Sequence, residues 1–70
     1  MISFTGYAEE KFAVLNRHGV FIRKEQVIAA LNAPDCLGRV GRHQSAEKDG
    51  LKVVYTVENN SQQVLTFYPV

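Results

Sequence analysis

The first half of the chain carries apolar residues at helical spacing, after a short segment that alternates like a strand. Ile2–Thr5 alternates apolar and polar side chains, which favours a short edge strand. From Tyr7 onward the apolar positions recur every three or four residues, and acidic residues precede basic ones, as the helix dipole favours. Because Gly19 is a good C-terminal stop, we predict a helix over Tyr7–His18 with one apolar stripe, formed by Ala8, Phe12 and Leu15.

A second helix is predicted over Lys24–Asn32, where apolar residues again share one face. It ends at Ala33, because Pro34 disfavours the helical conformation of the residue before it. The connector Val20–Ile22 is short and apolar. We expect it to fill the core between two helices that pack as a hairpin, with a brief strand as the alternative.

The second half of the chain is typical of strands joined by tight turns. A first strand segment runs from Leu37 to Lys48, and its register is left open by the pattern. Asp49 and Gly50 then form the strongest hairpin signal in the chain, because a type I′ turn needs positive φ at both central residues. Strands rich in β-branched and aromatic residues follow at Leu51–Glu58 and Gln62–Tyr68.

The sorting of side chains onto two faces favours a three-residue loop, Asn59–Ser61, between the last two strands. In this register Val53 pairs with Phe67 and Tyr55 with Leu65, which gives one strongly apolar face. A two-residue loop would mix apolar and polar residues on both faces. The apolar face also holds Leu51 and Val57, and the opposite face holds the pairs Lys52 with Tyr68, Val54 with Thr66, and Thr56 with Val64.

Together these elements predict an α+β fold, with two N-terminal helices packed on an antiparallel sheet of three to four strands. A chain of 70 residues has room for one core only, so residues 1–70 are expected to form a single domain. The 46% hydrophobic content is that of a globular protein. Since the one cysteine, Cys36, cannot form an internal disulfide, packing alone or a partner subunit must stabilise the fold.

The sequence favours a cytoplasmic protein with no membrane contact. Its apolar runs are shorter than the ~20 residues of a membrane-spanning helix. The start MISFTGYAEE lacks the basic and apolar regions of a signal peptide. The net charge of +1 gives no global attraction to nucleic acid, so any such binding must come from a local cluster.

No metal or cofactor site is predicted. His18, His43 and Cys36 are too widely spaced to form a ligand pair. Cys36 is more simply explained as a small buried hydrophobe than as a nucleophile. Gly38 and Gly41 lack the sequence context of a phosphate-binding loop, and bulges or bends in an edge strand explain them better.

The remaining candidates for chemistry are six basic and aromatic residues on the predicted sheet. Basic side chains neutralise phosphates and an aromatic ring stacks on a base, which is how small sheet proteins hold single-stranded RNA. Solvated basic residues also protect exposed strands from aggregation, and by composition alone this explanation is the more common one. The six residues are Arg39, Arg42, His43, Lys48, Lys52 and Tyr68.

Four segments of the chain resemble the small bacterial proteins of domain-of-unknown-function family 4258. The segments are YAEEKFAVLNRHGV, EQVIAALNAPD, GRVGRHQSAEK and LKVVYTVENNSQQVLTFYP, and they span almost the whole chain. The resemblance implies a fold similar to the RelE-like toxins and the wider barnase, colicin and RelE-like group. Members of that group cut RNA without a metal, because the 2′-hydroxyl of the RNA itself attacks the phosphate.

The resemblance also implies roles for individual residues. Arg42 and Lys52 would hold the phosphate, and Lys48 or Tyr68 would assist proton transfer, which makes these four the candidate catalytic residues. Arg39 and His43, with Lys52, would contact RNA. The hairpin tyrosine Tyr55 also matches the family, although our register turns it toward the core. The chain departs from the family where a histidine commonly begins the first helix, since Tyr7 stands there.

The leading hypothesis is therefore a RelE-like domain that acts on RNA, as a metal-independent endoribonuclease toxin or as a relative that binds RNA without cutting it. The expected partners are single-stranded RNA and an antitoxin-like protein, and the expected state is a monomer or a weak homodimer. The alternative is a non-enzymatic interaction module that docks a protein through its exposed sheet face or edge.

Overall fold

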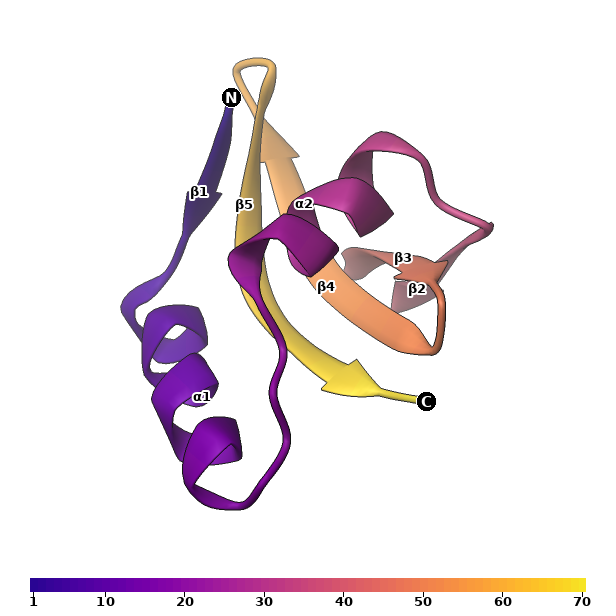
Figure 1. Cartoon of the computed structure of the whole chain (residues 1–70). Coiled ribbons are helices and arrows are strands. Elements are labelled where there is room, and N and C mark those ends of the chain that lie inside the picture. Colours follow the sequence, from indigo (N-terminus) through magenta and orange to yellow (C-terminus); the bar gives the residue numbers. More distant parts are fainter.

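The computed structural model describes all 70 residues, as two helices on a five-stranded sheet (Figure 1). The α+β class is confirmed. In chain order the elements are β1 (Ile2–Phe4), α1 (Gly6–Arg17), α2 (Lys24–Asn32), β2 (Cys36–Val40), β3 (His43–Lys48), β4 (Leu51–Glu58) and β5 (Ser61–Pro69). The sheet order is β1-β5-β4-β3-β2.

The sheet has one strand more than expected and is mixed rather than purely antiparallel. The segment from Leu37 to Lys48 is two strands, because Gly41 takes a positive φ of 61° and turns the chain back on itself. β1 is the expected edge strand, but it pairs parallel with β5. The first and last strands of the chain therefore lie side by side. Both helices belong to the connection from β1 at one edge of the sheet to β2 at the other edge.

α2 has the predicted bounds, and α1 begins and ends one residue before the predicted Tyr7–His18. The side chain of Thr5 accepts a hydrogen bond from the amide of Ala8 at 3.1 Å and caps the start of α1. Gly19, with a φ of 79°, follows its end. The side chain of Gln26 accepts from the amide of Arg23 at 2.8 Å at the start of α2, which spans the predicted residues Lys24–Asn32.

The two helices cover the same face of the sheet, but each packs on strands rather than on the other helix. α1 lies against β5 and β1, and α2 lies against β4 and β3 (Figure 1). The expected helical hairpin is therefore wrong. An exposed salt bridge of 2.7 Å between Glu9 and Lys24 links the two helices.

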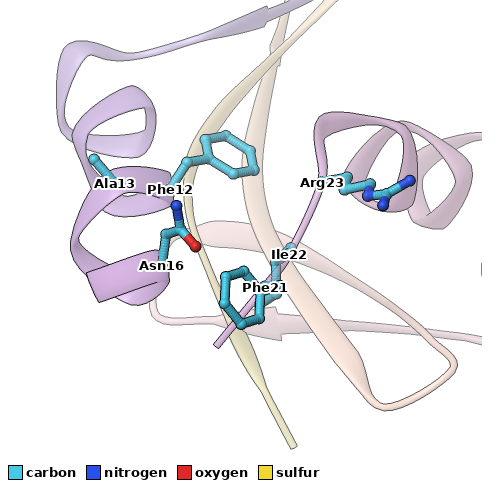
Figure 2. Close-up of a pocket in the computed structure, with 6 residues that line it drawn as sticks. All are labelled: Phe12, Ala13, Asn16, Phe21, Ile22 and Arg23. Carbon is cyan, nitrogen blue, oxygen red and sulfur yellow. The ribbon is translucent and has the colours of Figure 1, made fainter. Parts of the chain in front are cut away.

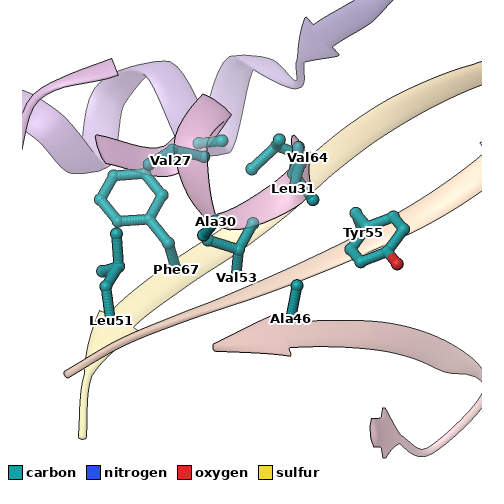
Figure 3. Close-up of a cluster of buried hydrophobic side chains, with 10 residues drawn as sticks. Val27, Ala30, Leu31, Ala46, Leu51, Val53, Tyr55, Val64 and Phe67 are labelled. Atoms are coloured by element: carbon teal, nitrogen blue, oxygen red, sulfur yellow. The ribbon is translucent and has the colours of Figure 1, made fainter. Parts of the chain in front are cut away.

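The core lies between this face and the helices. Val53 of β4 and Phe67 of β5 point toward Val27 and Ala30 of α2 (Figure 3). The predicted core positions Leu51, Val53 and Phe67 are confirmed as buried, and Tyr55 is buried with them. Leu65 is only partly buried and Val57 is exposed, so these two predicted core positions are wrong.

At its base the β4–β5 hairpin has the predicted residue pairs, but its turn is shorter than expected and its ladder contains a bulge. The turn has two residues, Asn59 and Asn60, both with positive φ, where we expected a three-residue loop. A bulge then shifts the register between Val54 and Tyr55, with Leu65 as the extra residue of β5. On the side of the bulge away from the turn, the ladder has the predicted pairs: Lys52 with Tyr68, Val53 with Phe67 and Val54 with Thr66. On the side near the turn the pairs differ from the prediction, since Tyr55 pairs with Val64 and Thr56 with Gln63.

The connector between the helices fills the core only in part. Ile22 packs against the core, whereas Phe21 is 74% exposed, and the connector forms no strand. Phe12, Phe21 and Ile22 line an open hollow between α1 and the start of α2, together with Ala13, Asn16 and Arg23 (Figure 2). The hollow exists because the helices do not pack against each other.

Two further expectations for β2 are corrected. Cys36 is exposed at the start of the strand rather than buried. Gly38 does not mark a bulge, since the ladder of β2 and β3 is regular through it. A Cβ atom at this position would lie 3.2 Å from the hydroxyl of Ser45, so glycine allows a close approach between neighbouring strands. No helix is long and apolar enough to cross a membrane.

Candidate nucleic-acid interface

The face of the sheet turned away from the helices, here called the open face, carries the predicted pair Lys52 and Tyr68. Alternation along a strand places both residues opposite the buried Val53 and Phe67, and the β4–β5 register sets them side by side. Both are partly exposed, so a ligand can reach them. Val54 and Ser45, which lie on the same face, are buried.

Lys11 of α1 joins this pair from across the edge of the sheet. β1 covers β5 only at Gln62–Val64, so the remainder of β5 has no neighbouring strand on that side. The Lys11 ammonium donates a hydrogen bond to the Thr66 hydroxyl at 2.9 Å and lies 5.4 Å from the centre of the Tyr68 ring. The ring of Tyr68 is thus flanked by Lys11 on one side and by Lys52 on the neighbouring strand.

The charges of this cluster are only partly neutralised. Burial lowers the pKa of Lys11, because the ammonium loses part of its hydration. Lys52 lies 3.9 Å from the carboxylate of Glu47, which is the limit of an ion pair, and both side chains are partly exposed. An anion placed beside Tyr68 would gain from both ammonium groups.

Lys11 was not among the residues predicted for the site. Its contact with Thr66 joins positions 55 residues apart in the chain. In the sequence Lys11 directly precedes Phe12, so the pattern predicts only that it lies at the edge of the apolar stripe of the helix. Nothing in the local pattern shows that the stripe's margin would meet the open face of the last strand.

Lys48, another of the predicted catalytic residues, does not join the cluster. It is the strand neighbour of Leu51 across the Asp49 and Gly50 turn, and Leu51 is in the core, so Lys48 lies on the helix side. There its ammonium donates to the carbonyl of Ala33 at 3.2 Å. The hairpin signal itself contained this answer, since a two-residue turn makes Lys48 and Leu51 partners.

Arg39, Arg42 and His43 are exposed and lie near the turn of the β2–β3 hairpin, away from the cluster. Arg42 lies in the turn rather than in a strand, and His43 begins β3 opposite Val40. Four residue steps separate His43 from Glu47, the neighbour of Lys52, which corresponds to about 13 Å. Arg39 lies opposite Gln44 on the helix side of the edge strand. The predicted phosphate pair Arg42 and Lys52 is therefore not brought together.

Tyr7, where the family resemblance places a histidine, is 67% exposed at the start of α1. It lies one helical turn before Lys11, and the two residues line the same shallow hollow along the helix. Tyr7 is therefore a neighbour of Lys11, which belongs to the candidate site. The other hairpin tyrosine, Tyr55, is buried in the core, as the register predicted.

No group of three or more histidine, cysteine, aspartate or glutamate side chains lies together as a metal site. Comparison of the chain with protein family models, with curated proteins and with solved structures finds no match.

Proposed function

We propose that this chain is a small RNA-binding domain of the RelE-like kind, which holds single-stranded RNA on its open face. Tyr68 stacks on a base, and Lys11 and Lys52 hold the phosphates on either side of it. The observation that carries the proposal is the cross-strand pair of Lys52 and Tyr68, with the Lys11 ammonium 5.4 Å from the same ring. An aromatic ring with one ammonium near it and a second lysine as its cross-strand neighbour offers a single strand both base stacking and phosphate contacts.

The open face is better suited to binding a strand of RNA than to enclosing a reacting phosphate. At its centre lie the buried residues Val54 and Ser45, and beside them are the partly exposed Lys52 and Tyr68. The second basic group, at Arg42 and His43, lies farther along β3 and offers further phosphate contacts to a strand of RNA that follows the sheet.

The same geometry favours binding over cleavage. Proton transfer needs its groups within hydrogen-bond reach of one phosphate. Of the four candidate catalytic residues, only Lys52 and Tyr68 lie together, since Lys48 is on the helix side and Arg42 is in a distant turn. The tyrosine in place of the family histidine removes a further acid or base that operates near neutral pH.

Fluorescence anisotropy with a labelled single-stranded RNA tests the proposal. Removal of the ring in Tyr68→Leu is expected to weaken binding by about 5- to 150-fold, since stacking contributes roughly 1–3 kcal/mol per base. Tyr68→Phe keeps the ring and is the matched control, with affinity close to that of the parent. Lys52→Gln should lower the slope of log affinity against log salt by about 0.7, the value for one phosphate contact with a single strand.

A parent protein that shows no salt-sensitive RNA binding would contradict the proposal, as would equal losses in Tyr68→Leu and Tyr68→Phe. The same samples, incubated with RNA and a metal chelator and separated on a gel, report cleavage. Intact RNA is expected. Cleavage that Tyr68→Phe abolishes would instead assign proton transfer to the phenol hydroxyl.

A second candidate function, the docking of a protein such as an antitoxin-like partner, is favoured by one observation. β2 is an edge strand, and all of its residues, Cys36–Val40, are exposed. A protein that binds there would leave the open-face cluster free. Capture of a partner by a parent protein that binds no RNA would favour this second function over the first.

A further inference from the structure

The free edge of the sheet at β2 is open to another strand. β2 is the outermost strand of the sheet, and neither helix packs on it (Figure 1). Leu37 is 66% exposed there. The strand contains no proline and no bulge, and Arg39 is its one charged residue.

The β2–β3 ladder shows which backbone groups of β2 point outward. The carbonyl of Glu47 accepts a hydrogen bond from the amide of Asp35 at 2.8 Å, so the backbone of Glu47 is directed toward β2. Every second residue of β3 shares this direction, and their partners on β2 are Cys36, Gly38 and Val40. The remaining residues of β2, Leu37 and Arg39, therefore direct their N–H and C=O groups to the free edge.

We infer that β2 pairs with β2 of a second copy of this chain, antiparallel and centred on Gly38. In this register Leu37 of each copy faces Arg39 of the other, and each facing pair exchanges both backbone hydrogen bonds. The outward groups lie symmetrically about Gly38, so one two-fold axis satisfies the edges of both copies. Such a self-complementary pairing is what a closed dimer requires.

The side chains also match in this register. On the helix side the stem of Arg39 covers the exposed Leu37, and on the open face Cys36 meets Val40. At the ends of the paired strands Asp35 of one copy comes near Gly41 and Arg42 of the other. Its carboxylate accepts a hydrogen bond from the amide of Asp49 in its own chain at 3.3 Å and adds a negative charge near Arg42. Two short strands bury less than the ~1,600 Å² of a standard interface, so the dimer is expected to be weak and dependent on concentration.

Disulfide cross-linking tests this register, because the native Cys36 faces Val40 of the second copy. In Val40→Cys the two cysteines would form a pair without mutual hydrogen bonds, with Cα atoms about 4.5 Å apart, which suits a disulfide. Within one chain the same residues are about 13 Å apart and cannot be joined. Mild oxidation of Val40→Cys should convert most of the protein to a covalent dimer on a non-reducing gel.

Two variants control for random collision. Cys36→Ser/Val40→Cys keeps only cysteines that are distant from each other in the dimer, and Arg39→Cys places the new thiol on the other face of the strand. Both should stay monomeric on the gel. Equal cross-linking in all three variants would overturn the register.

Sedimentation velocity across a range of concentrations tests the dimer without a new cysteine. Leu37→Lys places a charge at the edge and should shift the protein to the monomer. Val57→Lys, at another exposed apolar position with 50% exposure, should leave the equilibrium unchanged. A parent that is monomeric throughout the range would overturn the inference and leave the edge to a different protein. The open face stays accessible in the dimer, so RNA binding and self-association are measured separately.

Discussion

The ammonium group of Lys11 is partly buried between the Thr66 hydroxyl and the Tyr68 ring. Burial lowers its pKa from the ordinary value of 10.5, so between the lowered pKa and 10.5 the folded protein holds fewer protons than the unfolded chain. The desolvation cost to stability is therefore present below the lowered pKa, and stability rises as the pH increases through it.

RNA binding should respond to pH in the opposite direction. A phosphate beside Lys11 favours its charged form, so affinity is expected to fall as the pH rises through the lowered pKa, before ordinary lysines titrate. Anisotropy at increasing pH, up to the ordinary lysine pKa of about 10.4, should show a larger loss for Tyr68→Phe than for Lys11→Arg/Tyr68→Phe, since arginine stays charged. Both proteins carry Tyr68→Phe, so they differ only at position 11. Parallel losses in the two proteins would assign the pH dependence to other groups.

At the scale of elements, the β4–β5 hairpin reaches the predicted pairing through two compensating features. A two-residue turn at Asn59 and Asn60 sets one register, and the extra residue Leu65 shifts it by one position. The bulge bends β5 and brings Lys52 beside Tyr68 rather than beside Phe67. Without the shift, every side chain beyond it would change faces.

Deletion of Leu65 should therefore preserve the sheet. The ladder would become regular with the same pairs at its base, and the deletion removes a partly buried side chain and a long 3.4 Å hydrogen bond from Thr5 to the Leu65 carbonyl. A loss of a few degrees in Tm is expected, with a nuclear Overhauser contact between Val53 and Phe67 retained. Deletion of Val54 is the control. It puts the buried core residues Val53 and Tyr55 on opposite faces and should unfold the domain, whereas equal stability of the two variants would contradict this expectation.

At the scale of the whole molecule, stability depends on a small core, since only 12 of 70 residues are buried. Phe67 is fully buried and contacts Phe12, with ring centres 4.4 Å apart. Its loss would open a cavity at the contact between α1 and the sheet. A domain of this size has roughly 3–5 kcal/mol of stability from its core, so one such side chain is a large share of the total.

Phe67→Ala should leave the domain largely unfolded, because the substitution costs about 3–5 kcal/mol. Phe21→Ala is the matched control. With 74% of its surface exposed, Phe21 contributes little, and the melting curve should move by no more than a few degrees. Circular dichroism melts of both variants measure the difference, and an equal loss in the two would show that the connector, rather than the sheet, anchors the core.

The sequence by itself determined the features that depend on neighbouring residues. The ends of α2, the turn at Asp49 and Gly50, and the opposite faces of Val53 and Lys52 follow from caps, backbone propensities and strand alternation, which act over a few residues. The α+β class follows from the same local patterns. The pairing of Lys52 with Tyr68 was also predictable, since it rests on sorting the side chains of one hairpin.

Only the tertiary structure decided how distant elements meet. The parallel pairing of β1 with β5 leaves part of β5 uncovered, and this is what lets Lys11 reach Tyr68. The bulge at Leu65 left no mark in the pattern, because an extra apolar residue looks like its neighbours. The separation of Arg42 from Lys52 likewise depends on where the β2–β3 turn falls. These contacts join residues far apart in the chain, so only the packing of the whole sheet determines them.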